Sequence, residues 1–474
     1  MTRNRPQRPN RSRRHPRSRN PNERLDRGSD FGETPVSDPR VQQRNDASAA
    51  ALTQADEEAP KRRRRLPTRP RPRRPRSCAA VVAGGILAIA LVAGAAFAGI
   101  QLVRSRHFVS SSTASRPAGI PTHAPNPTAT PEPLPCGVPA SLLTSMSKRD
   151  KLAQLLMVGV TDAADARRVV ATDHVGGIFI ASWTDLSMLK DGELAAIAHS
   201  AGPLGLAVSV DEEGGRVERL SSLIGSAPSA RVLAQTESPE AVYQLALEHG
   251  RKMHNDGITI DFAPVVDVTD APDDSVIGDR SFSPNPAVVM DYAGAYAKGL
   301  RDAGVLPVLK HFPGHGHASG DSHTSGVVTP SLDDLKNLDL GPYRTLVAQA
   351  PVGVMIGHMV VPGLTDGNPA SLSPAAVVLL RNGTDYGGPR FDGPVFTDDL
   401  STMKAITDKY TVPQAVLKAL QAGNDTALWV TDTEIPAVLD RLEAAVDKHE
   451  LTMANIDASV RRMAKAKAVS GCHH

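Results

Sequence analysis

The chain has 474 residues, of which 41% are hydrophobic, enough for a large core, whereas only 4% are aromatic. Its formal net charge of +2 conceals a division: residues 1–76 carry 22 of the 53 Lys and Arg but 9 of the 51 Asp and Glu, so their net charge is +13 against −11 for the remainder. This division, together with the low count of 3 cysteines, excludes a uniformly basic nucleic-acid binder, a membrane protein with many spans and a small disulfide-built domain.

The first segment, residues 1–76, is rich in Arg, Pro, Asn and Ser. Such a composition cannot bury enough apolar surface to offset the entropy of ordering, so we predict a disordered basic tail. The tail ends in two dense basic runs, residues 61–65 and 69–76. These runs fix the orientation of the segment that follows them, and their charge also suits anionic lipid.

Residues 77–103 are predicted to form one transmembrane anchor. The run Cys78–Val103 carries no charge over 26 residues, and about 20 apolar residues span a bilayer. Because the positive flank precedes the run, we expect a cytoplasmic tail and a catalytic domain outside the cell membrane. A cleaved signal peptide is the alternative, since residues 96–98 (AFA) fit a cleavage site, although a basic region of 76 residues is long for such a peptide.

Residues 104–135 are rich in Ser, Thr, Pro and Ala and predict an extended linker, so the folded domain should occupy residues 136–474. In this domain apolar runs that predict strands alternate with helical patterns. The predicted strands are 176–180, 204–210, 258–268, 305–310, 351–358, 393–397 and 427–430. The predicted helices are 148–157, 163–172, 186–201, 238–256, 286–303, 373–382, 413–422 and 434–447.

Short strands alternating with helices are typical of parallel βαβ units. Seven or eight such units predict an α/β fold of the (β/α)8 TIM-barrel type, in which the active site lies at the carboxyl ends of the strands. A doubly wound open sheet is the alternative. The first predicted strand is followed by no phosphate or dinucleotide fingerprint, which favours the barrel.

Polar clusters follow four of the predicted strands. They are 211–219 (DEEGGRVER), 278–282 (GDRSF) downstream of Asp261 and Asp267, 310–323 (KHFPGHGHASGDSH) and 396–401 (FTDDLS). Strand ends of a barrel face one pocket, so we expect these clusters to converge. Asp399 is interpreted as a helix cap, Asp261 and Asp267 as core-edge residues bonded to loops, and Glu212 and Glu213 as solvated.

These four clusters resemble bacterial β-N-acetylglucosaminidases of glycoside hydrolase family three, and the likeness extends from about residue 140 to 470. The resemblance implies Asp398 as catalytic nucleophile and His323 as general acid/base on a mobile loop, polarised by Asp321. It also implies a sugar site made of Asp211, Arg219, Arg280, Lys310 and His311. The implied substrate is a non-reducing terminal N-acetylglucosamine on muropeptides or cell-wall fragments. We expect no cofactor, no nucleic acid and a monomer.

The chemistry of these residues agrees with the resemblance. A retaining glycosidase needs a carboxylate beside the anomeric carbon, which Asp398 supplies, and a proton donor near the leaving oxygen. A histidine titrates near neutrality, so His323 can donate a proton and then accept one, while Asp321 fixes its tautomer. Ser322 would place these two side chains on one side of an extended segment. Arg219 and Arg280 are equally open to a structural role as partners of neighbouring acids.

Three other functions are open to the same residues. A β-glucosidase is the alternative within the family. A metallohydrolase is suggested by His311, His315, His317 and His358 together with Asp398, although Pro313 and Gly314 break the segment that joins the first two. A catalytically silent wall-binding module on a stalk is the last alternative, but it would not require both Asp398 and the Asp321–His323 pair.

Two of the three cysteines are predicted to pair. Cys136 opens the folded domain and Cys472 lies near its end. The first and last elements of a closed barrel are neighbours, and both positions lie on the outer side of the predicted anchor, where disulfides persist. We therefore predict a Cys136–Cys472 disulfide, with two unpaired thiols as the alternative.

Overall fold

The computed structural model describes residues 133–472. The predicted tail (1–76), the anchor (77–103) and most of the linker (104–135) lie outside the described residues. Within the described part of the chain, no helix is both long enough and apolar enough to cross a membrane.

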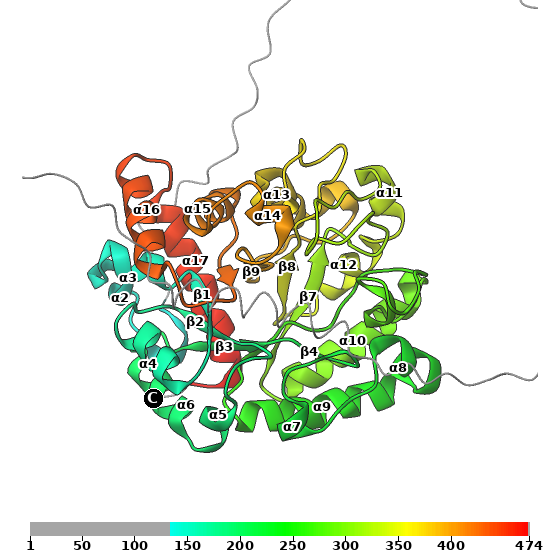
Figure 1. Ribbon diagram of the computed structural model, residues 1–474, viewed down its shortest axis with the longest axis horizontal. Helices are drawn as coiled ribbons and strands as arrows, with labels where there is room; N and C mark the ends of the chain where they lie inside the picture. Colours follow the sequence, from blue (N-terminus) through cyan, green and yellow to red (C-terminus); the bar gives the residue numbers. More distant parts are fainter. Residues whose placement is uncertain (1–132, 473–474) are drawn as a thin grey trace, which may run out of the picture. The chain divides into compact units, whose positions relative to one another are not determined.

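Eight parallel strands form the centre of the domain, with helices around them (Figure 1). In sheet order the strands are β10 (Ala427–Trp429), β1 (Leu156–Val160), β2 (Gly177–Ile180), β3 (Ala207–Val210), β6 (Ile260–Asp261), β7 (Leu306–Phe312), β8 (Gly353–Ile356) and β9 (Val395–Thr397). A parallel bridge between Phe396 and Thr426 brings β9 to the segment leading into β10. The sheet is thus nearly closed and is consistent with the predicted TIM-type barrel.

The remaining elements are helices and one small hairpin. The α-helices are α2 (Ser141–Ser145), α3 (Lys148–Ala153), α4 (Ala163–Ala171), α5 (Ser187–Lys190), α6 (Glu193–Ser200), α7 (Ser221–Ile224), α8 (Ala230–Thr236), α9 (Pro239–Asn255), α10 (Pro286–Asp302), α11 (Leu332–Asn337), α12 (Gly341–Leu346), α13 (Pro374–Asn382), α14 (Lys404–Thr407), α15 (Val412–Ala422), α16 (Ile435–Asp447) and α17 (Met453–Lys467). The 3₁₀ turns are η1 (Pro135–Gly137), η2 (Gly278–Arg280), η3 (Ala370–Leu372), η4 (Thr384–Tyr386) and η5 (Ala468–Ser470). The hairpin joins β4 (Glu212–Gly214) and β5 (Val217–Glu218).

Local sequence signals explain where several helices begin and end. The Ser238 hydroxyl accepts a hydrogen bond from the Ala241 N–H, and Pro239 occupies the first position of α9, where its missing N–H costs nothing. Helix α13 begins at Pro374 and stops at Gly383, whose φ of 73° favours a residue without a Cβ. The predicted helices at both places are therefore confirmed.

The prediction was wrong at the first strand. The predicted helix 148–157 ends at Ala153 as α3, and residues 156–160 form β1 between β10 and β2. Every residue of β1 is buried, so its sequence reads as one apolar run without alternation. Such a run cannot be distinguished from a buried helix by its period.

Two apolar layers surround the strands. Inside the barrel, Phe262 packs edge-on against Phe396 with ring centroids 5.5 Å apart, and Phe179 lies 6.1 Å from Phe262. The larger layer lies between the strands and the outer helices and is mainly aliphatic. Because side chains fill the interior, the barrel is a packed scaffold and function must lie at its ends.

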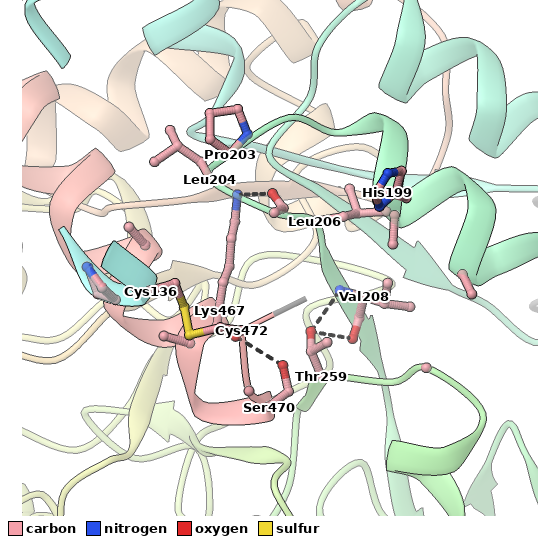
Figure 2. Close-up of a pocket in the computed structure, with 18 of the residues that line it drawn as sticks. Cys136, His199, Pro203, Leu204, Leu206, Val208, Thr259, Lys467, Ser470 and Cys472 are labelled. Carbon is pink, nitrogen blue, oxygen red and sulfur yellow. Dashed lines mark hydrogen bonds between the residues drawn. A yellow bond between two sulfur atoms is a disulfide. The ribbon is translucent and has the colours of Figure 1, made fainter. Parts of the chain in front are cut away.

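The amino-terminal end of the barrel is closed by α17. Met463 of α17 belongs to the cluster inside the barrel, and the Lys467 amino group donates to Gln154 Oε1 at 2.9 Å and to the Gly205 carbonyl at 3.0 Å. The two cysteines predicted to pair are joined by a disulfide, with Cα atoms 5.4 Å apart. Figure 2 shows this disulfide and Lys467 beside a cavity of about 410 Å³ at that end.

Removing this disulfide is expected to lower stability without changing the chemistry. The bond joins residues 336 positions apart. The chain-entropy model gives about 6 kcal/mol for so long a loop, whereas measured disulfides stabilise by at most about 5 kcal/mol, so we expect Cys136→Ser/Cys472→Ser to lose no more than about 5 kcal/mol. Urea titrations of the variant and the wild type measure the difference in unfolding free energy. Equal midpoints under oxidising conditions would contradict a stabilising role.

Candidate active site

The predicted clusters converge at the carboxyl ends of the strands. Asp211 follows β3, Lys310 and His311 lie in β7, and Asp398 follows β9. In a (β/α)8 barrel these strand ends surround one pocket. The structure thus brings together groups that lie up to 187 positions apart in the chain, from 211 to 398.

A buried network of two cations and two carboxylates forms one side of the site. The Lys310 amino group lies 2.5 Å from Asp211 Oδ1 and 2.5 Å from Glu213 Oε1. The Arg280 guanidinium donates to both oxygens of Glu213, at 2.7 and 2.8 Å. Glu213 therefore joins Arg280 to Lys310, and Lys310 in turn binds Asp211; these three partners are all residues predicted to bind sugar.

The prediction that Glu212 and Glu213 are solvated was wrong, because both are buried. Burial alone would raise the pKa of Glu213, but the charges of Arg280 and Lys310 hold it well below the usual range. Burial would likewise lower the pKa of Lys310, whereas Asp211 and Glu213 raise it. Glu213, Lys310 and Arg280 are consequently ionised at neutral pH. The sequence did contain a signal that could have placed Glu213 in the site: it lies two residues after Asp211, so in an extended segment both side chains point to the same side.

A bulge in β7 aims two consecutive side chains into the site. The register with β8 shifts between Leu309 and Phe312, so Lys310 and His311 both face the pocket, which a regular strand would not allow. His311 Nδ1 lies 2.7 Å from Asp267 Oδ2, and its Nε2 lies 3.5 Å from Arg280. This places His311 next to the charged network, as predicted.

Asp267 holds the start of the loop that follows β7. Its Oδ1 accepts from the N–H groups of His311 at 3.3 Å and His315 at 2.7 Å. Burial raises the pKa of Asp267, but the His311 imidazole and its hydrogen bond outweigh burial and lower it. The prediction of a core-edge carboxylate bonded to a loop is confirmed.

The Asp398 carboxylate stands at the end of β9, half-buried, and its Oδ1 accepts from the Asp399 N–H at 2.9 Å. Burial would raise the pKa of Asp398. The imidazoles of His358 and His311, the N–H of Asp399 and the imidazole of His323 outweigh burial, so the pKa is lowered. The carboxylate is therefore ionised at neutral pH, the state that a nucleophile requires.

Two neighbours keep Asp398 in place. Asp399 accepts from the N–H groups of Ser401 and Thr402, each at 2.9 Å, and so closes a bend after β9. The predicted helix cap was wrong, because the next helix, α14, begins only at Lys404. The buried His358 places Nε2 2.7 Å from the Asp399 carbonyl and Nδ1 2.7 Å from the Ser371 hydroxyl. Burial lowers the pKa of His358, and a neutral ring must carry its proton on Nε2, because a carbonyl only accepts.

The Asp321–His323 pair lies on the loop after β7. His323 Nδ1 lies 2.8 Å from Asp321 Oδ1, which also accepts from the His323 N–H at 2.9 Å. The extended segment expected around Ser322 is instead a turn, closed by the Ser325 N–H on the Asp321 carbonyl at 2.9 Å. The Ser322 carbonyl accepts from the Ala405 N–H at 3.1 Å, which holds the loop against the segment after β9.

Arg219 is the one predicted sugar ligand that stays apart from the charged network. It follows β5, its side chain is half-buried, and its N–H donates to Glu212 Oε2 at 2.7 Å. Its guanidinium makes no ion pair within residues 133–472. The structural role considered for both arginines was an ion pair with a neighbouring acid. Arg219 does not form such a pair within the described residues, whereas Arg280 pairs with Glu213.

The histidines considered as metal ligands have separate partners. His311 bonds to Asp267, His317 Nδ1 lies 3.0 Å from Asp339 Oδ2, and His358 bonds to Ser371. Among the residues that the structure describes, no three His, Cys, Asp or Glu side chains are grouped as a set of metal ligands.

Comparison with known proteins decides the family. The N-terminal domain of glycosyl hydrolase family 3 matches residues 147–466. The chain belongs to glycoside hydrolase family 3. It is 66% identical over 348 residues to the beta-hexosaminidase LpqI of Mycobacterium tuberculosis. The aligned region covers 73% of this chain and 89% of LpqI. The chain is thus a glycosidase, and the resemblance seen in the four clusters is confirmed.

Solved structures extend the comparison to the fold. A family 3 glycosyl hydrolase from Mycobacterium smegmatis superposes with a TM-score of 0.68 at 68% identity, over 68% of this chain and 98% of that one. A family 3 beta-N-acetylglucosaminidase from Paenibacillus superposes with a TM-score of 0.64 at 32% identity, over 69% of this chain and 63% of that one. Both agree with the barrel described above.

Proposed function

We propose that the protein is a retaining β-N-acetylhexosaminidase that releases non-reducing terminal N-acetylglucosamine through a covalent glycosyl-aspartate intermediate. The observation that carries this proposal is that the Asp398 carboxylate follows β9 while the Asp321–His323 pair lies on a loop that the Ala405 N–H holds against the segment after β9. The printed names of the relatives, beta-hexosaminidase and beta-N-acetylglucosaminidase, support this choice of sugar.

In the first step Asp398 attacks the anomeric carbon and forms a glycosyl ester. The bond from that carbon to the leaving oxygen breaks, and His323 Nε2 gives its proton to this oxygen. Asp321 accepts from Nδ1, so the donated proton comes from the nitrogen that faces away from Asp321. The pair therefore supplies the acid that a second carboxyl supplies in most glycosidases.

In the second step water replaces the ester. The neutral His323 takes a proton from the water, whose oxygen attacks the anomeric carbon, and the bond to Asp398 breaks. The carboxylate and the protonated imidazole are both restored. Two displacements at the same carbon retain its configuration.

The charged network binds the terminal sugar in this proposal. Asp211, which is half-buried, has an oxygen free to accept from sugar hydroxyls, and charge-assisted bonds fix orientation well. Arg219, Arg280, Lys310 and His311 complete the sugar site. Because Lys310 and Arg280 are already paired with carboxylates, the site is organised before the substrate arrives, which limits the entropy lost on binding.

The natural substrate we propose is a muropeptide or another cell-wall fragment that carries N-acetylglucosamine. This proposal rests on the resemblance and on the predicted anchor at residues 77–103, which would hold the enzyme at the outer face of the membrane through the linker. Tryptic shaving of intact cells, followed by peptide mapping of residues 136–474, tests this location.

Paired chromogenic substrates test the sugar specificity. We expect the p-nitrophenyl β-N-acetylglucosaminide to be hydrolysed with a kcat/KM at least about 100-fold above that of the matching β-glucoside, because a site built to bond the acetamido group leaves polar groups unpaired without it. The reverse order would support the β-glucosidase alternative, and Asp398→Asn serves as the control for contaminating activity.

A further inference from the structure

Glu212 lies between the two carboxylates of the charged network but turns away from them. Asp211 and Glu213 bind Lys310, whereas the Glu212 side chain accepts from the N–H groups of Arg219 at 2.7 Å and Leu220 at 2.8 Å through the same oxygen, Oε2. In the β4–β5 hairpin, Glu212 lies directly opposite Glu218 in the strand register. One buried side chain thus ties the residue after the hairpin back to the end of β3.

The backbone of Glu212 is fixed from two further elements. Its N–H donates to Asp261 Oδ1 of β6 at 3.0 Å, and its carbonyl accepts from the Tyr296 hydroxyl of α10 at 2.9 Å. Glu212 is therefore held by β6 and α10 while it holds Arg219. A shift at this residue would be passed to Asp211 on one side and to Arg219 on the other.

Within residues 133–472, no cation forms an ion pair with Glu212. Lys310 and Arg280 are matched by Asp211 and Glu213. Glu212 Oε1 and Asp261 Oδ2 are both buried and have no hydrogen-bond partner among residues 133–472. A protonated Asp261 beside an ionisable Glu212 avoids placing two further buried negative charges beneath the sugar site.

We propose that Glu212 is a positioning residue for the sugar site, whose carboxylate holds the Arg219 backbone while Asp261 stays a neutral acid beside it. The inference rests on the proposed function, in which Arg219 and Asp211 bind the sugar. Glu212 itself touches no reacting atom. Its state should consequently change the KM, which reports binding, more than the kcat.

This role makes the KM depend on pH. Burial raises the pKa of Glu212 to about 7, although the N–H groups of Leu220 and Arg219 oppose the rise, and burial raises the pKa of Asp261 well above its usual range. The titratable and charged groups facing this pair are Asp211, Glu213, Glu218, Arg219, Tyr296 and Lys310. Above pH 7 the Glu212 carboxylate makes charge-assisted bonds, and below pH 7 the protonated acid makes weaker ones, so the KM should rise as the pH falls.

The test compares Glu212→Gln with the wild type at about pH 6 and about pH 8. The glutamine oxygen keeps both backbone bonds without charge, and charge-assisted bonds are about twice as strong as neutral ones, so we expect a KM about fivefold higher at pH 8. The variant should also lose the rise in KM between pH 8 and pH 6 that the wild type shows. Glu240→Gln, an exposed change at the start of α9, is the control that should retain it.

The outcomes separate this inference from the proposed function. If the wild type hydrolyses the N-acetylglucosaminide but Glu212→Gln keeps the same rise in KM, the inference is overturned and the proposed function stands. Asp261→Asn provides a second measurement, because an amide mimics the neutral acid. It should retain a wild-type KM within about twofold, and a KM that rises as in Glu212→Gln would show that Asp261 is ionised.

Discussion

Replacing Asp398 with asparagine is expected to lower kcat by at least about 10³-fold while the protein stays folded. An amide cannot form the glycosyl ester, so the first displacement is lost. The change keeps the shape of the side chain, and the amide oxygen of the new side chain can still accept from the Asp399 N–H that bonds to Asp398 now. Steady-state kinetics on the nitrophenyl N-acetylglucosaminide, with circular dichroism as a folding control, measure both parts of the expectation.

A mechanism-based fluorosugar distinguishes the two neighbouring carboxylates. It should label Asp398, because Asp399 is occupied by the N–H groups of Ser401, Thr402 and Val430. Peptide mapping locates the label. Modification of Asp399, or wild-type turnover by Asp398→Asn, would remove the basis for a nucleophile at position 398.

The fold could be predicted from the sequence because most of its strands have clear boundaries. Gly176 precedes β2 and Gly177 is its first residue, and the apolar run that follows ends before Ser182. Strand β1 gave no such signal, since it is buried on both faces and only two residues separate it from α3. The predicted strand 258–268 pairs regularly only over Ile260–Asp261, and beyond it the chain makes one isolated bridge, from Val265 to Lys310.

The candidate site could be predicted where one residue carries a recognisable chemistry. Asp398 and His323 belong to distinctive segments, and the barrel brings strand ends together whatever lies between them. Glu213 was missed because a run of acids after a strand also reads as a solvated surface. Its partners, Lys310 and Arg280, come from β7 and the turn η2, and no local pattern links elements so far apart.

His358 was missed for a related reason. As a single histidine at the end of a strand it was considered only as a metal ligand, whereas it bonds to the Asp399 carbonyl and so supports the residue next to Asp398. The geometry of the Asp321–His323 pair was also misjudged. The pairing was expected from an extended segment, but a turn forms it, because Asp321 accepts from the backbone N–H and the ring of the same residue.

Replacing His323 with alanine is expected to harm substrates with poor leaving groups most. A sugar alkoxide needs a proton as it departs, and general acid catalysis contributes about 10²- to 10⁴-fold to such steps. A nitrophenolate leaves more easily without help, so its first step should slow much less. The ratio of kcat/KM for a natural disaccharide to that for the nitrophenyl glycoside should therefore fall about 100-fold or more in the variant.

Asp321→Ala is the matched variant for this experiment. Its loss should have the same dependence on the leaving group but be smaller, because His323 remains while the acceptor that orients Nδ1 at 2.8 Å is gone. Both side chains of the pair are partly exposed, so removing either one should not unfold the protein. A folding defect would therefore not explain a loss of activity in either variant. Equal losses on both substrate classes would indicate that His323 only positions the loop, and the proton would then have to come from another group in the pocket.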